Sequence, residues 1–223
     1  MGVKLSDVQE WMQELAQKRP IFHSEADFQH ALALHLSVSH RREIRVEYPI
    51  GNGNLGWCDI AIMADGKPFA ALELKYMTAA AIEEIGEEKF NLKAQGAQDI
   101  RRYDVWKDAF RLEELMNKSA GVRSTAVIAL SNDSAYWRGG QAETAQDRAF
   151  CLREEEATRV VTGSLGWKDR TPKGTTGKNR LALTLHKNYR PKWFDYGDQV
   201  SSKTRFRYLV LYQERDDAPP TEL

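Results

Sequence analysis

The stretch from Trp57 to Lys75, WCDIAIMADGKPFAALELK, constrains the fold more than any other part of the chain. Two apolar runs are joined by Asp65-Gly66, a dipeptide that strongly favours a two-residue hairpin turn. Because both runs are short and lie between turn residues, we expect two adjacent strands of a buried sheet. Side chains alternate along a strand, so Glu73 and Lys75 should share one face.

Three charged side chains stand inside these apolar strands: Asp59, Glu73 and Lys75. Burying an unpaired charge costs on the order of several kcal/mol, so charges in such strands suggest a site. Mg²⁺ binds carboxylate and carbonyl oxygens, which Asp59, Glu73 and the Leu74 carbonyl could supply. Lys75 could then orient or deprotonate a metal-bound water for hydrolysis of a phosphodiester. The alternative is a simple ion pair between Glu73 and Lys75, with Asp59 starting a turn.

Asp59 followed by Glu73-Leu74-Lys75 resembles the signature of the PD-(D/E)XK nuclease superfamily. The resemblance covers roughly residues 22–131 and identifies no subfamily. It implies an α/β, restriction-endonuclease-like fold, with an αβββαβ core and a mixed central sheet flanked by helices. It also implies Mg²⁺ as the cofactor, with Mn²⁺ able to substitute, and nucleic acid, with DNA expected, as the substrate.

Members of this superfamily usually carry an acidic residue on a helix before the first core strand, and Glu25 fits that place. The resemblance therefore implies that Glu25 joins Asp59, Glu73 and Lys75 in the catalytic group, where it would bind a second metal or a water. An alternative needs no metal, because a carboxylate in the first turn of a helix is stabilised by the helix dipole.

Hydrophobic periodicity predicts the remaining elements. We expect helices over residues 4–18, 25–39 and 89–117, strands over 41–50, 124–130, 181–185 and 207–212, and a short helix or a mobile flap over 78–88. Because the long helix joins strand 124–130 to the preceding strand, those two strands should be parallel. Gln95 and Gln98 on the long helix could contact the site or phosphates.

The charge distribution is uneven although the net charge is zero, with 32 Lys and Arg against 32 Asp and Glu. Residues 161–210 hold eleven Lys and Arg but three Asp and no Glu. Such asymmetry points to a polyanion as the partner. We expect an N-terminal helix at 1–21, a nuclease-like core at 22–160, a basic β-containing C-terminal extension packed on the same domain at 161–215, and a disordered tail at 216–223.

A loop rich in glycine and threonine is expected at residues 163–177. The basic residues in and just after it are candidates for contacts with the phosphate backbone: Lys168, Arg170, Lys173, Lys178 and Arg180. A merely solvated loop is the alternative. Aromatic residues interleaved with these charges could stack on bases, although such residues more often belong to a core: Trp167, Tyr189, Trp193, Phe194 and Tyr196.

Several classes of protein and site are disfavoured. No apolar run approaches the roughly 20 residues of a membrane span, so no membrane partner is expected. Cys58 and Cys151 are too few for a disulfide framework, so we expect reduced thiols in a cytoplasmic protein. His30, His35 and His40 recur every five residues, which on a helix turns each about 140° from the last, so we do not expect a shared metal.

The combined interpretation is a Mg²⁺-dependent nuclease in which Asp59 and Glu73 bind the metal and Lys75 orients the attacking water. Two alternatives stay open. One is a non-catalytic nucleic-acid-binding or assembly protein that keeps the fold, and the other is a metal-dependent phosphohydrolase acting on a nucleotide or small phosphoester. Cleavage of both strands of a duplex would favour a homodimer, although the sequence shows no interface.

Overall fold

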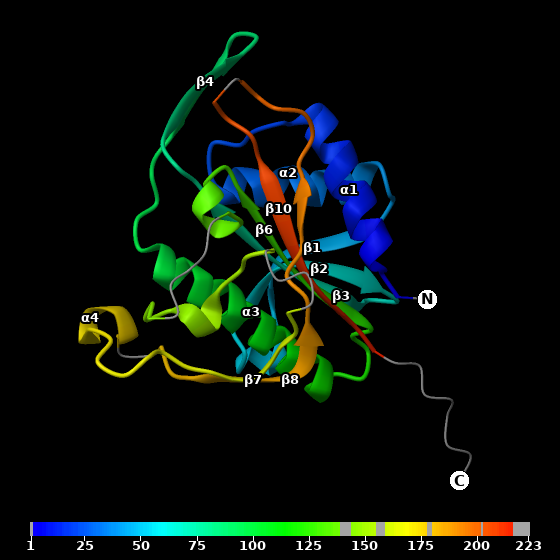
Figure 1. Cartoon of the computed structure of the whole chain (residues 1–223). Helices are drawn as coiled ribbons and strands as arrows, with labels where there is room; N and C mark the ends of the chain where they lie inside the picture. The colour runs from blue at the N-terminus through cyan, green and yellow to red at the C-terminus, as the bar shows by residue number, and fades with distance from the viewer. Residues whose placement is uncertain (1, 139–143, 155–158, 178–179, 202, 216–223) are drawn as a thin grey trace.

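The computed structural model describes residues 2–138, 144–154, 159–177, 180–201 and 203–215. Six strands form a central sheet in the order β1-β2-β3-β6-β10-β9 (Figure 1). The sheet is mixed, because β3 and β6 are parallel while the other neighbouring strands are antiparallel. The strands are β1 (Glu43–Pro49), β2 (Trp57–Ala64), β3 (Lys67–Met77), β6 (Ser124–Ser131), β9 (Trp193–Asp195) and β10 (Arg207–Glu214).

Different helices cover the two faces of this sheet. α1 (Leu5–Lys18) and α2 (Glu25–Val38) pack on one face, and α3 (Gln98–Lys118) packs on the other (Figure 1). Along β3, Leu72, Leu74 and Tyr76 join the core on the α1–α2 side. The residues between and beside them face α3: Ala71, Glu73, Lys75 and Met77. The alternation predicted for this strand is confirmed, and so is the expectation of an α/β fold with a mixed sheet flanked by helices.

The hairpin predicted at Asp65-Gly66 joins β2 to β3. Both residues have positive φ, 51° at Asp65 and 72° at Gly66, as the two central residues of a type I′ turn require. Ala64 pairs with Lys67 directly across the turn. Local turn chemistry therefore determines where this pair of strands reverses.

The predicted parallel crossover is also confirmed. α3 carries the chain from the β3 side to β6, and Glu73 pairs with Val127 while Lys75 pairs with Ala129. The elements α2, β1, β2, β3, α3 and β6 follow one another in that order along the chain. A hairpin of β4 (Ala81–Ile85) and β5 (Glu88–Leu92) is inserted between β3 and α3 and projects from the body of the protein (Figure 1).

This hairpin corrects two predictions. Residues 78–88 do not form the short helix that was one of the two expectations for them, and the helix expected over 89–117 begins only at Gln98. Phe90 and Leu92 are buried while their neighbours are exposed, which is the period of a strand and not of a helix. Ala97 then adopts a left-handed conformation, with φ 57°, immediately before α3 begins.

The basic C-terminal extension completes the central sheet. β10 pairs with β6 over eight residue pairs, from Arg207↔Ser131 to Glu214↔Ser124. β7 (Val161–Leu165) and β8 (Leu183–Tyr189) form a separate two-stranded sheet beside α3. The buried carboxylate of Glu113 on α3 accepts hydrogen bonds from the backbone N–H groups of His186 (2.8 Å) and Lys187 (3.1 Å) in β8. The short elements are η1 (Gly51–Gly53), η2 (Ser134–Tyr136), η3 (Arg148–Phe150) and α4 (Lys173–Thr176).

Several remaining expectations concern burial. Tyr189, Trp193 and Tyr196 are buried in the core, so base stacking is not open to them. Cys58 and Cys151 are free, buried thiols. Part of the loop expected from residue 163 is strand β7, and the predicted tail at 216–223 lies outside the described residues. Within the part of the chain that the structure describes, no helix combines the length and the apolar character that crossing a membrane requires.

Candidate active site

The site forms where β2 separates from β3. The ladder between these strands ends at the Ile60↔Leu72 pair, while β2 continues to pair with β1 as far as Trp57. Two carboxylates take over the backbone groups that the ladder would have paired. Asp59 Oδ2 accepts a hydrogen bond from the Leu74 N–H (2.5 Å), and Glu25 Oε2 accepts one from the Tyr76 N–H (2.8 Å). Unpaired backbone N–H groups are costly when buried, so the two acids also supply the hydrogen-bond acceptors that these two N–H groups of β3 need.

Glu25 reaches β3 from the first turn of α2. Ser24 caps this helix by accepting a hydrogen bond from the Asp27 N–H (3.1 Å), which fixes where the helix begins. The helix therefore delivers Glu25 to a strand residue 51 positions later in the chain. The carboxylate lies near the strand residues singled out from the sequence, and it also occupies a first-turn position that favours negative charge.

Lys75 is held by two oxygens on the α3 side of the sheet. Its Nζ lies 2.6 Å from Asp108 Oδ2 and donates a hydrogen bond to the Leu74 carbonyl oxygen at 3.0 Å. Burial alone would lower the pKa of Lys75, but the negative charges of Asp108 and Glu25 outweigh burial and raise that pKa. The ammonium group therefore stays protonated at neutral pH, so it can donate hydrogen bonds but cannot accept a proton.

Glu73 is the most buried acid of the site, with 3% of its side chain exposed. Its Oε1 lies 3.2 Å from a guanidinium nitrogen of Arg111, yet among the described residues no group donates a hydrogen bond to that oxygen. Burial first, and then the charge of Asp108, raise the pKa of Glu73 to about 9, against the opposing charge of Arg111. At neutral pH this carboxyl group therefore holds its proton, and a bound cation would favour its ionised form.

Arg111 ties α3 to the segment that leads into β2. It donates hydrogen bonds to Asp108 Oδ1 (2.8 Å), to the Leu55 carbonyl (2.9 Å) and to the Trp57 carbonyl (2.5 Å). Asp108 thus stands between the two cations, with one oxygen toward Lys75 and the other toward Arg111. The side chains from β3 and α3 form one connected network.

Asp59 belongs to the same electrostatic cluster. Burial raises the pKa of its carboxyl group, the Leu74 N–H and Lys75 lower it, and the charges of Glu25 and Asp108 raise it further. Four carboxylates therefore surround the two cations, Lys75 and Arg111. With all groups ionised the cluster carries an excess of negative charge, which a divalent cation would neutralise.

The donor set suits a hard divalent cation in its chemistry. Asp59 and Glu73 offer carboxylate oxygens, and the Leu74 carbonyl comes directly after Glu73 in the chain. Oxygen ligands of this kind are those that Mg²⁺ prefers. These carboxylates are not drawn tightly together, however. Among the described residues, the one group of three acidic or histidine side chains with ligand atoms within 4.8 Å of one another lies elsewhere. Binding at this site would therefore draw Asp59 and Glu73 toward a shared ion.

Sequence reasoning missed Asp108 and Arg111. Asp108 lies in the apolar stripe of α3 that includes Val105, Ala109 and Leu112, and it is buried. A charge inside such a stripe was visible in the sequence and could have identified the residue. Gln29 was missed as well; its amide donates to the Asp59 carbonyl (2.9 Å) and so helps to position the residue.

Within the part of the chain that the structure describes, neither of the two glutamines proposed to support the site forms a hydrogen bond with Asp59, Glu73 or Lys75. Gln95 precedes α3 and is not on the helix, and its backbone N–H donates to the Thr78 carbonyl (2.9 Å). Gln98, the first residue of α3, donates from its amide to Asp133 Oδ2 (2.5 Å). The early start assigned to this helix is the reason that Gln95 was misplaced.

The predicted phosphate-binding residues lie on the β7–β8 connection. Lys168, Arg170 and Lys173 are exposed, and α4 carries Lys173 away from the central sheet (Figure 1). Arg180 lies closer to the site. The pKa of Asp104 on α3 is raised by burial and by Asp108 and lowered by several cations, among them Lys75 and Arg180. Lys178 lies outside the described residues.

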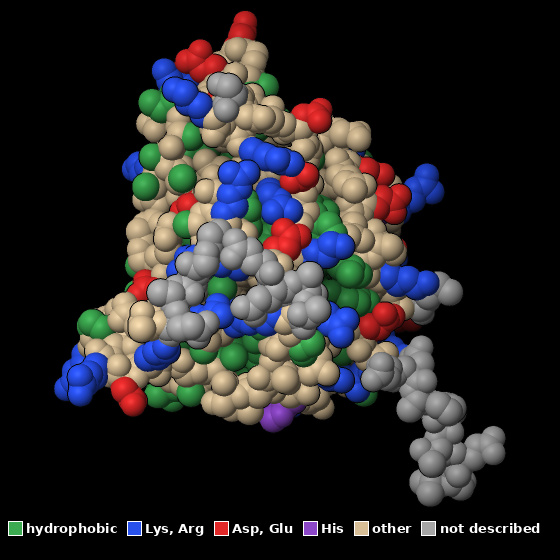
Figure 2. All heavy atoms as spheres, in the orientation of Figure 1, with side chains coloured by type: hydrophobic (Ala, Val, Ile, Leu, Met, Phe, Trp, Pro, Cys, Tyr) green, Lys and Arg blue, Asp and Glu red, His purple; other side chains and the backbone are tan. Residues whose placement is uncertain are grey.

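A second basic surface was not anticipated. A cavity of about 790 Å³ opens where β6 ends and β10 begins, and Lys and Arg side chains gather around the start of β10 (Figure 2). Part of this positive charge is neutralised, because Arg205 pairs with Asp195 (2.6 Å) and Arg207 pairs with Glu154 (3.0 Å). The basic residues lining the cavity are Arg138, Lys203, Arg205 and Arg207.

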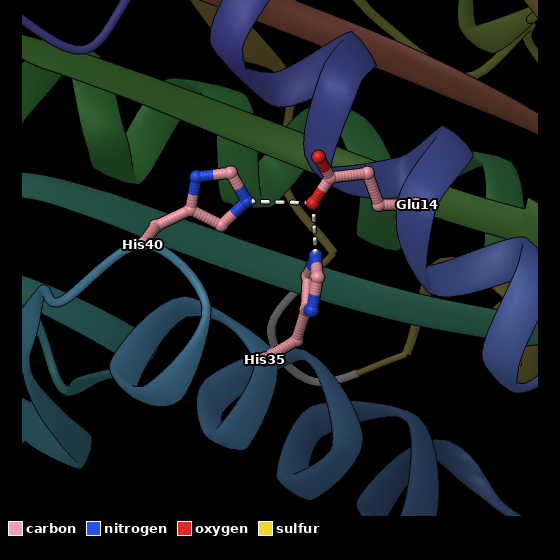
Figure 3. Close-up of side chains that lie close together, drawn as sticks. All are labelled: Glu14, His35 and His40. Carbon is pink, nitrogen blue, oxygen red and sulfur yellow. Dashed lines mark hydrogen bonds and ion pairs between the residues drawn. The ribbon is translucent and has the colours of Figure 1, made fainter.

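The expectation that the histidines cannot converge was wrong for two of them. α2 ends at Val38, so His40 is not on the helix and the helical rotation does not apply to it. His35 and His40 both approach the carboxylate of Glu14 (Figure 3).

Searches against family models, characterised proteins and solved structures found no match to this chain.

Proposed function

We propose that this chain is a metal-dependent nuclease with a restriction-endonuclease-like core, acting on DNA. The observation that carries the proposal is the partly buried cluster of charges at the end of the β2–β3 ladder. There Asp59 and Glu25 hold the backbone of β3 on either side of Lys75, which lies beside the Leu74 carbonyl, and Glu73 is the buried acid of the same strand. The succession α2-β1-β2-β3-α3-β6 supports it, since that order is the one the resemblance implies.

In this proposal Asp59, Glu73 and the Leu74 carbonyl hold Mg²⁺ or Mn²⁺. The bound ion supplies Lewis-acid stabilisation of phosphoryl oxygens and lowers the pKa of water. Lys75 remains protonated and donates a hydrogen bond, so it orients the attacking water and stabilises negative charge in the transition state. Asp108 positions Lys75 through its 2.6 Å contact. Glu25 holds the backbone of β3 beside these groups.

One observation favours a second candidate, a nucleic-acid-binding protein without catalysis. Asp108 already pairs with Lys75, and Arg111 already lies 3.2 Å from Glu73, so part of the charge is compensated without a metal. A site of this kind could be held together by ion pairs alone. Catalysis and metal binding must therefore be tested separately.

The test is cleavage of linear duplex, circular duplex and single-stranded DNA, and of RNA, with Mg²⁺, with Mn²⁺ and with a chelator. Metal-dependent cleavage is expected, together with its loss in Lys75→Ala while binding of nucleic acid survives. Lys107→Ala, which removes an exposed lysine of α3, is the matched control. Cleavage that persists in a folded Lys75→Ala protein would remove the lysine from the mechanism.

Metal binding is measured separately by calorimetric titration with Mn²⁺. Asp59→Asn should weaken binding because it removes a charged oxygen ligand. Asp65→Asn is the control, since Asp65 is exposed in the hairpin turn and asparagine tolerates its positive φ. Equal Mn²⁺ affinity in wild type and Asp59→Asn, with cleavage absent from both, would favour the non-catalytic alternative.

A further inference from the structure

Three side chains from separate segments meet at the outer ends of α1 and α2. Glu14 lies on α1, His35 lies on the last turn of α2, and His40 follows that helix (Figure 3). Glu14 Oε2 is 3.0 Å from His35 Nε2 and 2.9 Å from His40 Nε2. Both imidazoles therefore direct the same ring nitrogen at one carboxylate oxygen.

The His35 nitrogen in this group is buried without a hydrogen bond. Only 3% of the His35 side chain is exposed, and among the described residues its Nε2 has no hydrogen-bond partner. The contact with Glu14 is close enough for an ion pair, but it lacks the geometry of a hydrogen bond. In the tautomer that carries its proton on Nδ1, this buried ring nitrogen would direct its lone pair into the group, where a metal ion could bind it.

We propose that Glu14, His35 and His40 bind a first-row transition-metal ion, with Zn²⁺ the expected ion and water as the fourth ligand. Two imidazoles and a carboxylate with an open position form a donor set typical of Zn²⁺. Tetrahedral Zn²⁺ separates its nitrogen and oxygen ligands by about 3.3 Å, as follows from bonds of about 2.0–2.1 Å. The present separations of 2.9 and 3.0 Å therefore need to widen by only a few tenths of an ångström.

Exposure at the site allows that movement. The Glu14 side chain is 39% exposed and that of His40 is 19% exposed, so both can shift and water can reach the open position. The two rings also support each other, because His35 and His40 pack edge to face with centroids 5.1 Å apart. The buried ring of His35 thus acts as the fixed ligand, and Glu14 and His40 close around the ion.

Lys18 opposes metal binding and so gives a specific test. Its Nζ lies 3.4 Å from His35 Nδ1 and 3.2 Å from Ser39 Oγ. A metal on Nε2 requires a proton on Nδ1, which would then face the Lys18 ammonium, another donor. Lys18 must turn to Ser39 alone when the metal binds. Removing the lysine should therefore strengthen binding.

This metal site is distinct from the proposed nuclease centre. His35 lies ten residues after Glu25 on α2, which corresponds to about 15 Å along the helix axis. The ligand chemistry also differs, because imidazole nitrogens favour Zn²⁺ whereas the oxygen donors at Asp59 and Glu73 favour Mg²⁺. An ion bound here would join the last turns of α1 and α2.

The experiment is calorimetric titration of the full chain with Zn²⁺ after treatment with a chelator. Wild type should bind one ion, and His40→Asn and Glu14→Gln should weaken binding by about tenfold or more, since even changes beyond the direct ligands typically cost that much. His30→Asn is the matched control, because His30 is exposed on the same helix. Asp59→Asn should bind Zn²⁺ normally, which separates this inference from the nuclease proposal.

Two further measurements keep the proposal falsifiable. His40→Asn is the decisive variant, because the His40 side chain is partly exposed whereas a change at the buried His35 could prevent folding. Lys18→Met should bind Zn²⁺ more tightly than wild type, and Co²⁺ should give the visible absorption of a four-coordinate ion with nitrogen ligands. Failure of wild type to bind Zn²⁺, equal affinity in His40→Asn and His30→Asn, or weaker binding in Lys18→Met would overturn the assignment.

Discussion

Asp108 governs the chemistry open to Lys75. It holds the ammonium group at 2.6 Å, and its negative charge, with that of Glu25, raises the pKa of Lys75. A lysine held in this state acts by donating hydrogen bonds, which limits its part in the proposed reaction to orienting water and stabilising charge. At Glu73 burial is the dominant effect. It raises the pKa of the carboxyl group, and the positive charge of Arg111 only partly offsets that rise.

The raised pKa of Glu73 predicts a pH-dependent stability. The folded protein holds a proton on Glu73 that the unfolded chain has lost, so the free energy of unfolding falls as the pH rises from about 5 to about 9. Glu73→Gln cannot lose that proton. In a chelator, its melting temperature should exceed that of wild type by a few degrees at pH 8, and the difference should shrink toward pH 5.

Added Mg²⁺ provides the control for this prediction. If Glu73 is a metal ligand, Mg²⁺ should raise the melting temperature of wild type more than that of Glu73→Gln and so reduce the difference. A difference between the two proteins that does not change with pH would show that Glu73 is ionised in the folded protein.

Arg111 predicts a larger loss of stability. Arg111→Gln removes the partner of Asp108 and Glu73 and the hydrogen bonds to the Leu55 and Trp57 carbonyls. Removing one partner of a buried ion pair typically destabilises by about 3–5 kcal/mol, and partial exposure of Arg111 places the expected loss at about 2–4 kcal/mol in urea unfolding.

A double variant separates the two acids that Arg111 contacts. Above about pH 9, where Glu73 is ionised, Glu73→Gln/Arg111→Gln should be less destabilised than the sum of the single changes, because glutamine does not need the guanidinium. Additive losses would mean that Arg111 acts through Asp108 and the backbone carbonyls alone.

The β7–β8 connection carries exposed positive charge at its tip and Arg180 at its base. If the connection contacts a phosphate backbone, each neutralised phosphate contributes about −0.9 to the slope of log K against log salt on duplex DNA. Lys168→Ala/Lys173→Ala should therefore flatten the slope by up to about 2 and weaken binding to all sequences alike.

Lys67→Ala/Lys118→Ala is the matched pair of exposed lysines. Lys67 begins β3 and Lys118 ends α3, so both lie at the ends of their elements away from Glu73 and Asp108. An unchanged slope in Lys168→Ala/Lys173→Ala would assign the β7–β8 connection to solvated surface. The basic cavity at Arg138 and Lys203 would then be the next surface to test.

The chain folds as one unit because its last strands complete the central sheet. β10 lies between β6 and β9 and buries Leu209 and its neighbours against α3 and the rest of the core. A chain ending at residue 160 would leave β6 as an unpaired edge, which exposes backbone hydrogen-bonding groups. We expect such a chain to show no cooperative thermal transition by circular dichroism.

A chain ending at Arg215 is the comparison for this truncation. It keeps β10 and the hydrogen bond from the Arg215 N–H to the Arg123 carbonyl (2.8 Å), so it should unfold cooperatively. Cooperative unfolding of the chain that ends at residue 160 would show that residues 161–215 are dispensable for the fold.

The sequence by itself determined the local architecture. Asp65-Gly66 specified the hairpin, alternation placed Glu73 and Lys75 on one face of β3, and helical periodicity identified α1 and α2. These features depend on neighbours within a few residues, so local steric preferences and burial patterns are sufficient to predict them. The same reasoning failed where two periodicities competed, at the β4–β5 hairpin.

Only the tertiary structure decided which distant groups meet. Asp108 reaches Lys75 because α3 packs on the face of β3 that carries it, and His40 reaches Glu14 because the chain leaves α2 at Val38. Neither contact follows from the spacing of residues along the chain. Each depends on how whole elements pack to bury apolar surface, and that packing also determines which charges must be paired and which remain available to bind a cation.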